Sequence, residues 1–194
     1  IICLQETTKG HQRYFASALT DEYPYQDEAL SSIHNGPMIL SKFPLRNCRY
    51  EESEAGVNGF AICEAKVSGQ WVQIINIHLQ PIIAVGLTKW NELAKIHRRE
   101  AAQIYGMLDD QMPTLIAGDF NAFHNSAAPA FLAKQGFRDV FAEVNSNAES
   151  HPTIAKKVWG ITVRARIDFL FRNAELVSRS ARVFDGDPSD HHGV

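Results

Sequence analysis

Residues 114–122 read Thr114-Leu115-Ile116-Ala117-Gly118-Asp119-Phe120-Asn121-Ala122, and this stretch decides the fold of the 194-residue chain. Its apolar half has the composition of a short buried strand that ends at Gly-Asp-Phe-Asn. Because side chains of a strand alternate between its faces, we expect Asp119 and Asn121 on one side and Phe120 in the core. Polar groups at the end of a buried strand are typical of α/β active sites. A turn closed by an Asx cap is the alternative interpretation.

Four further segments follow the same pattern, in which an apolar run leads to polar, titratable residues. Residues 1–4 lead to Gln5-Glu6, and residues 72–77 lead to His78. Near the C-terminus the sequence has Arg166-Ile167-Asp168 and then Ser189-Asp190-His191-His192. Each motif alone has a simpler explanation, such as an exposed acid after a strand or a histidine bonded to a backbone carbonyl. Five such motifs in one chain favour a functional site.

The hydrophobic periodicity predicts strands early and late in the chain, with helices between them. Strands are expected at residues 1–5, 38–41, 48–54, 59–67, 71–78, 163–171 and 176–184, with turns at Ser68-Gly69 and Asn173. Helices are expected at residues 9–19, 88–109 and 127–135, with Thr88 and Ser126 as N-caps. His97 lies on the apolar stripe of the long helix, so we interpret it as a core histidine rather than a ligand. The pattern predicts mixed sheets packed face to face with helices outside.

The composition is that of one globular domain rather than of a strongly charged binder. Hydrophobic residues make up 45% of the chain, and the net charge is −3. A dedicated duplex-DNA binder usually carries a basic face, whereas the longest Lys/Arg runs here are Arg98-Arg99 and Lys156-Lys157. The charge therefore argues against tight nonspecific nucleic-acid binding, although a local basic groove does not show in a net charge.

The three cysteines predict neither a disulfide framework nor a zinc site. Cys3, Cys48 and Cys63 form no CxxC pair, and their count is odd. Each is expected as a small apolar residue in a strand, which fits a reducing compartment. No apolar run approaches the roughly 20 residues that span a bilayer, and no signal peptide is visible. These features favour the cytoplasm, while secretion stays open because the chain begins at Ile1 without Met.

In chain order, Gln-Glu, Asn-x-His, Gly-Asp-Phe-Asn, Arg-Ile-Asp and Ser-Asp-His resemble the motifs of the endonuclease/exonuclease/phosphatase superfamily of deoxyribonuclease-like phosphoesterases. The resemblance implies an α/β fold, a four-layer sandwich of two mixed β-sheets packed face to face and flanked by helices, with the site at one edge. It also implies a single domain over residues 1–194. Two strands of the family, an earlier one with a metal-binding Asn and one after Ser-Asp-His, have no counterpart, so we expect a domain trimmed at both ends or a fragment.

The resemblance implies a divalent cation, Mg²⁺ or Mn²⁺, held by carboxylates. Glu6 matches the metal-binding Glu of the family, and Asp190 is expected near the metal or the attacking water. A carboxylate is the hard oxygen ligand that these cations prefer.

The remaining motif residues are expected to carry the chemistry. Asp119 would orient or deprotonate the attacking water, and Asn121 would bind the phosphate or position Asp119. His78 and His191 would donate to phosphate oxygens, and Asp168 would fix the tautomer of a histidine, which in the family is the one matching His78.

The substrate is the least determined part of the sequence. We expect a nuclease-type phosphodiesterase that acts on a phosphate ester, and nucleic acid is the first substrate class. We also expect the protein to be a monomer. Phosphomonoesterase or lipid-headgroup activity is the alternative, and a non-catalytic binding module is the third. Arg166 could reach a phosphate or form a salt bridge, and Trp159 could stack on a base or merely cover the core. No extended loop or hairpin that would select a substrate is evident.

Overall fold

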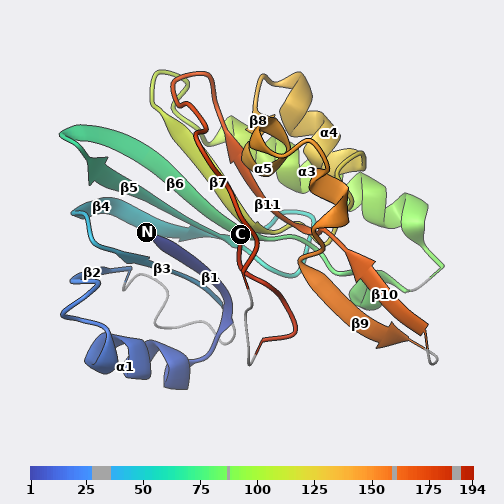
Figure 1. Cartoon of the computed structure of the whole chain (residues 1–194), viewed down its shortest axis with the longest axis horizontal. Helices are drawn as coiled ribbons and strands as arrows, with labels where there is room; N and C mark the ends of the chain where they lie inside the picture. Colours follow the sequence, from blue (N-terminus) through green and yellow to red (C-terminus); the bar gives the residue numbers. More distant parts are fainter. Residues whose placement is uncertain (28–35, 87, 159–160, 185–188) are drawn as a thin grey trace.

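Two β-sheets pack face to face between helices, as Figure 1 shows in a computed structural model of the chain. The structure describes residues 1–27, 36–86, 88–158, 161–184 and 189–194. The smaller sheet has the order β1-β3-β2, with β1 Ile2–Thr7, β3 Gly36–Ser41 and β2 Tyr25–Gln26, and its pairs are antiparallel. Helix α1, Lys9–Ala18, follows β1 and covers the outer side of this sheet.

The larger sheet is mixed and has the order β4-β5-β6-β7-β11-β8. Its strands are β4 Leu45–Glu51, β5 Phe60–Val67, β6 Gln70–His78, β7 Thr114–Asp119, β11 Asp168–Arg172 and β8 Arg138–Asp139. Strands β6 and β7 are parallel, whereas the other neighbouring pairs are antiparallel. Ser68 and Gly69, both at positive φ, form the predicted turn between β5 and β6.

Helices cover the outer face of the larger sheet (Figure 1). They are α3 Trp90–Gly106, α4 Ala127–Lys134 and α5 Val140–Val144, whereas the short helix α2 Ile82–Val85 precedes α3 and the 3₁₀ turn η1 Ala148–Ser150 follows α5 along the chain. One apolar cluster, which includes Phe120, Ile75 and Ala101, lies between this sheet and α3 and α4. A second cluster, which includes Ile39 and Cys63, lies between the two sheets. The four-layer sandwich predicted from the sequence is therefore confirmed. Among the described residues, no helix is both long and apolar enough to cross a membrane.

Gly118 allows β6 and β7 to approach closely just before Asp119. Its φ is +138°, and a Cβ atom at this position would lie 2.0 Å from the carbonyl oxygen of Ile77. Any side chain would therefore push the two strands apart or bend the chain where the polar residues begin.

Three local predictions were wrong. Residues 176–184 form no strand, and at the start of this segment the side chain of Arg172 bonds the carbonyl oxygen of Leu176 and the Ser178 hydroxyl. Helix α3 begins after Lys89, with no side-chain cap from Thr88. Ser126 precedes α4 as predicted, but its hydroxyl donates to the carbonyl of Phe123 instead of capping the helix.

Cys48 and Cys63 form a disulfide, which corrects the prediction that each cysteine is an isolated apolar residue. They lie on the neighbouring strands β4 and β5, where the register shifts between Arg46 and Arg49 and the two Cα atoms lie 4.1 Å apart. Cys3 stays free, and burial raises the pKa of its thiol to about 12. A bonded pair removes the basis on which the cysteines favoured a reducing compartment.

A separate hairpin, β9 Ile154–Val158 and β10 Ile161–Ala165, forms a two-stranded sheet of its own. The sequence predicted neither this hairpin nor the break at Arg166-Ile167 that separates it from β11. The bridge between Ile154 and His191 places the base of the hairpin beside the C-terminal segment.

Candidate active site

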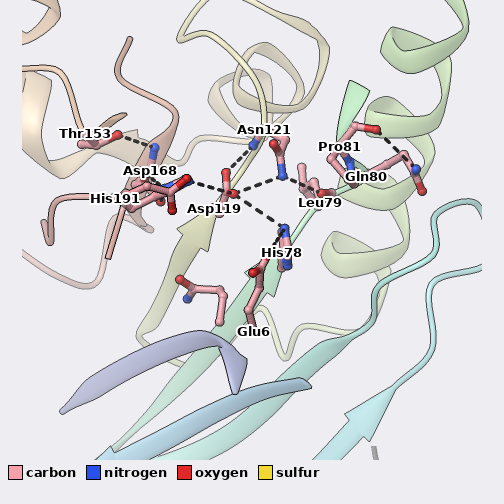
Figure 2. A network of polar contacts seen from close by, with 12 residues as sticks. Glu6, His78, Leu79, Gln80, Pro81, Asp119, Asn121, Thr153, Asp168 and His191 are labelled. Carbon is pink, nitrogen blue, oxygen red and sulfur yellow. Dashed lines mark hydrogen bonds and ion pairs between the residues drawn. The ribbon is translucent and has the colours of Figure 1, made fainter. Parts of the chain in front are cut away.

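Three strand ends of the larger sheet converge at one edge. His78 ends β6, Asp119 ends β7 and Asp168 begins β11, and the ladders pair His78 with Asp119 and Asp119 with Asp168. Glu6 comes from β1 of the facing sheet, and His191 comes from the C-terminal segment. Figure 2 shows these side chains turned toward one another. The structure thus brings together five of the residues predicted from the motifs.

Asn121 holds the carboxylate of Asp119. Its backbone N–H donates to Asp119 Oδ1 at 2.7 Å, and its Nδ2 donates to Asp119 Oδ2 at 3.1 Å and to the Leu79 carbonyl at 3.0 Å. The positive φ of Asn121, +47°, turns the chain so that both contacts form. Phe120 between them is fully buried, as the alternation predicts. Of the two roles considered for Asn121, positioning of Asp119 is the one that these contacts support.

Asp168 pairs with His191, not with His78 as the resemblance implied. Its two carboxylate oxygens lie 2.9 and 3.1 Å from His191 Nδ1. His78 instead faces Asp119 and Glu6, with its Nε2 at 3.7 Å from Asp119 Oδ2 and 3.8 Å from Glu6 Oε1. Asp168 occupies Nδ1 of His191, so the other ring nitrogen, Nε2, faces the centre of the cluster. This Nε2 atom lies 4.0 Å from Asp119 Oδ2.

The electrostatics of the cluster shift three pKa values. Burial, together with the negative charge of Asp168, raises the pKa of Asp119 to about 7. The hydrogen bond to Asp168 raises the pKa of His191 to about 9. Burial lowers the pKa of His78, against the opposing effect of Glu6. At neutral pH the site therefore holds a cationic His191, a neutral His78 and an Asp119 that exchanges protons readily.

The carboxylates fit a divalent cation. Asp119, Asp168 and His191 each offer one ligand atom within 4.8 Å of the others. Asp119 is buried beside a second carboxylate, which is why its pKa is raised, and a cation would relieve this repulsion. Glu6 has an exposed side chain at a positive φ of 55°, and its carboxylate reaches toward His78. Oxygen-rich donors of this kind suit Mg²⁺ and Mn²⁺.

Three predicted site residues lie apart from this cluster or outside the described residues. Asp190 is exposed and pairs with Lys156 at 3.7 Å, and among the charges acting on His191 it comes after Asp168 and Asp119. Arg166 is buried and forms ion pairs with Asp139 at 2.7 Å and Glu149 at 2.8 Å, which is the salt-bridging alternative. Trp159 lies outside the described residues.

Two amides that join the sheets behind the site were not predicted as site residues. Asn76 is fully buried in β6, and its Nδ2 donates to the carbonyls of Leu4 and Met38 in the facing sheet. Gln5 donates to Asn76 Oδ1 at 2.6 Å, and it directly precedes Glu6. The sequence signal that could have indicated this contact is Asn76 inside the apolar run from residue 74 to residue 77. A buried amide needs hydrogen-bond partners, and these had to come from another segment. His97, predicted as a core residue, is buried and bonds the Gln80 carbonyl.

Sequence comparisons identify relatives along nearly the whole chain. A model described as the Endonuclease/Exonuclease/phosphatase family matches residues 1–191. "Uncharacterized protein YbhP" of Escherichia coli (strain K12) is 22% identical over 168 residues, which cover 75% of this chain and 62% of that protein. The counterpart in Shigella flexneri matches to the same extent. The chain therefore spans about 62% of the length of these curated relatives.

Solved structures share the fold. An endonuclease/exonuclease/phosphatase from Beutenbergia cavernae superposes with a TM-score of 0.75 at 17% identity, over 98% of this chain and 60% of that one. D. rerio TDP2 complexed with single strand DNA product gives 0.74 at 17% identity, over 98% and 82%. Sphingomyelinase C from Streptomyces griseocarneus gives 0.67 at 18% identity, over 98% and 83%. At these identities the likeness concerns the fold alone.

Proposed function

The chain belongs to the Endonuclease/Exonuclease/phosphatase family, and from this premise we propose that it is a divalent-metal-dependent phosphoesterase. It would hydrolyse phosphodiester bonds by in-line attack of an activated water. The observation that carries the proposal is the convergence of Asp119, Asp168, His191, His78 and Glu6 at one sheet edge, with a cationic His191 beside a basic Asp119. We further propose that the chain acts as a monomer.

Asp119 and His191 divide the chemistry between them. With a pKa near 7, the buried Asp119 carboxylate would take a proton from the attacking water, while Asn121 holds it in place. The hydroxide formed would attack phosphorus opposite the leaving oxygen. His191, cationic and held at Nδ1 by Asp168, would donate from Nε2 to a non-bridging oxygen, where negative charge increases in the transition state.

His78 and the carboxylates complete this site. Because its pKa is lowered, His78 is uncharged at neutral pH and keeps one ring N–H. It would donate this N–H to another phosphoryl oxygen. Glu6 would hold Mg²⁺ or Mn²⁺, with the negative charges of Asp119 and Asp168 close by. Asp190 stays a predicted ligand that would have to leave Lys156. Such a cation, when bound, offsets the negative charge of the phosphodiester and lowers the pKa of water.

A nuclease-type substrate is the first candidate because cations flank the site. Arg164 and Lys156, of which Lys156 pairs with the exposed Asp190, lie exposed on the β9–β10 hairpin, and the base of this hairpin is bridged to His191. Cations in this place would bind the phosphates that follow the scissile bond. The residues Arg166 and Trp159 add nothing to this argument, since Arg166 is already paired with two acids.

A lipid-headgroup phosphodiester is the second candidate, favoured by exposed apolar side chains. Val57, Ile83 and Phe123 are 71%, 74% and 50% exposed, and they lie in the segments that precede β5, follow β6 and follow β7 at the edge that carries the site. Apolar side chains around a phosphodiesterase site would suit an interface with lipid. A binding module without activity is the third reading, against which stands the presence of His78, Asp119, Asp168 and His191 together in the cluster.

The experiment is a panel of Mg²⁺- and Mn²⁺-dependent hydrolysis assays. The substrates are plasmid DNA, single-stranded RNA, bis-p-nitrophenyl phosphate, sphingomyelin and inositol phosphates. We expect cleavage of polynucleotide, and a fall of about 10²–10⁴-fold in kcat when Asp119→Asn removes the base. Asp21→Asn, which alters an exposed aspartate in the turn after α1, is the matched control and should keep wild-type activity.

Stability measurements show whether a loss of activity comes from chemistry or from unfolding. Because the folded-state pKa of Asp119 is raised from 3.8 to about 7, its contribution to stability is present below pH 3.8 and lost as the pH rises through 7. Metal-free Asp119→Asn should therefore melt no lower than the wild type at pH 8. Mg²⁺ should raise the melting temperature of the wild type more than that of the variant. A less stable variant, or a fully active one, would refute the assignment of Asp119.

A further inference from the structure

Thr153 lies beside the Asp168–His191 pair, as Figure 2 shows, and it is fully buried. It follows the turn η1 and directly precedes β9, so it stands where the hairpin leaves the body of the molecule. The residues of the cluster all project from strand ends or from the C-terminal segment. Thr153 belongs to neither, and its side chain does not touch the reacting centre.

The hydroxyl of Thr153 accepts two successive backbone N–H groups. Oγ1 lies 3.0 Å from the nitrogen of Ile167 and 3.1 Å from the nitrogen of Asp168. A hydroxyl oxygen has two lone pairs, and both are therefore used by the chain at the start of β11. Asp168 is the residue whose carboxylate bonds His191, so the side chain of Thr153 fixes the backbone from which that carboxylate projects.

The backbone of the same residue holds the segment that carries His191. The Thr153 carbonyl accepts the N–H of His192 at 2.7 Å, and the Thr153 N–H donates to the Ala165 carbonyl at 2.9 Å. One buried residue thus joins both members of the Asp168–His191 pair, Asp168 through its side chain and His191 through the neighbouring His192. Small shifts of either member would misdirect the imidazole, since hydrogen bonds weaken steeply with angle.

We propose that Thr153 is a positioning residue of the phosphoesterase reaction, whose hydroxyl sets the carboxylate of Asp168 against His191. The inference rests on the proposed function, because the pair it aligns is the one that would stabilise the transition state. The loss of its hydroxyl should lower kcat and leave KM nearly unchanged, since no substrate contact is removed.

The test compares Thr153→Val, which keeps the shape and removes the hydroxyl, with Thr153→Ser, which keeps the hydroxyl. With bis-p-nitrophenyl phosphate and Mg²⁺, we expect Thr153→Val to lower kcat about 10- to 100-fold, the range found for groups that orient a catalytic ligand. Thr153→Ser should restore most of the activity. Thr162→Val, at an exposed threonine of β10, is the matched control and should behave as the wild type. If Thr153→Val does not fold, Thr153→Ala takes its place.

Amide hydrogen exchange gives a readout that does not depend on turnover. In Thr153→Val the amides of Ile167 and Asp168 should lose protection, while that of His192, bonded to the unchanged carbonyl, should keep it. A variant with wild-type kcat and a lower melting temperature would overturn the proposal and leave Thr153 a structural residue only. Wild-type protein that cleaves nothing would contradict the proposed function, and unchanged protection of Asp168 in Thr153→Val would separately refute the alignment.

Discussion

Two neighbouring carboxylates, Asp119 and Asp168, have different partners and so different roles. Asp119 is held by the amide of Asn121, which leaves it able to exchange a proton. Asp168 is held through its backbone by Thr153, and it bonds His191 with both oxygens. Their ladder register places them directly opposite each other, so each negative charge acts on the other. Environments that differ in this way allow one carboxylate to act as a base while the other orients the imidazole of His191.

Asp168→Asn should move the pH profile of kcat/KM toward acid. The bond to Asp168 is the main cause that raises the pKa of His191 to about 9, so its removal should return that pKa toward the ordinary 6.5. The alkaline limb of the profile, where His191 loses its proton, should therefore move to lower pH. Activity at pH 8 should drop about tenfold or more. Because Asp168 also raises the pKa of Asp119, the acid limb should shift in the same direction.

The measurement is kcat/KM from pH 5 to pH 10 at a fixed, saturating Mg²⁺ concentration, with Asp110→Asn as a control at an exposed aspartate. A uniform loss of activity, with both limbs where the wild type has them, would contradict the electrostatic role and indicate a purely geometric one.

At the level of single elements, the disulfide joins β4 to β5 near the rim of the larger sheet. Cys48 and Cys63 are 15 residues apart, and a crosslink that closes a loop of this length stabilises the folded state by about 3 kcal/mol. The double variant Cys48→Ala/Cys63→Ala should lose roughly that much free energy of unfolding in urea. Cys3→Ala, which removes the free, half-buried thiol, is the control for the loss of a sulfur atom without the loss of a crosslink.

Activity provides the second readout of the disulfide variant. Strands β6, β7 and β11 carry the cluster, and β4 lies at the far edge of the same sheet, so kcat should change little at temperatures well below melting. Equal stability of the double variant and the oxidised wild type would show that the bond does not form in solution.

Most strands could be predicted from local patterns in the sequence. Contacts that depend on the register between distant segments could not. The alternation around Phe120 and the polar ends at His78 and Asp119 are set by near neighbours, so they could be predicted. The pairing of Cys48 with Cys63 depends on a shift in the β4–β5 register, which no local pattern contains. The partner of Asp168 depends in the same way on the path of the C-terminal segment past Thr153.

The role of Arg166 could not be chosen from the sequence alone. Its place two residues before Asp168 allowed either a phosphate ligand or a salt bridge, and its guanidinium is buried against Asp139 and Glu149 and over the ring of Phe169. A charged side chain becomes a structural residue when the fold supplies acids around it, and those acids come from other parts of the sequence.

Across the whole molecule, the helical layer is tied to the site edge by one buried acid of α3. Glu100 is fully buried, with Oε2 accepting the N–H of Gln80 at 3.2 Å and Oε1 accepting the hydroxyl of Ser53 at 3.2 Å. Gln80 follows His78 by two residues, and its own side chain accepts the N–H of Val57. The close fit leaves no room for a side chain at Gly56, where a Cβ would lie 2.0 Å from Glu100 Oε1. The carboxyl group of Glu100 thus joins α3 to the segment after β6 and to the segment before β5.

Glu100→Gln should flatten the pH dependence of global stability. Burial raises the pKa of Glu100 from 4.5 to about 7, so the stability it contributes is complete below pH 4.5 and is lost as the pH rises through 7. The wild type should therefore lose up to about 3 kcal/mol relative to Glu100→Gln over this interval. Asp119 titrates in the same range in both proteins, so the difference between their urea curves at pH 4.5 and pH 8 isolates Glu100. Glu92→Gln, at an exposed position of the same helix, is the control, and its free energy of unfolding should depend on pH as that of the wild type does. If Glu100→Gln showed this same dependence, the carboxyl group of Glu100 would be solvated and the prediction wrong.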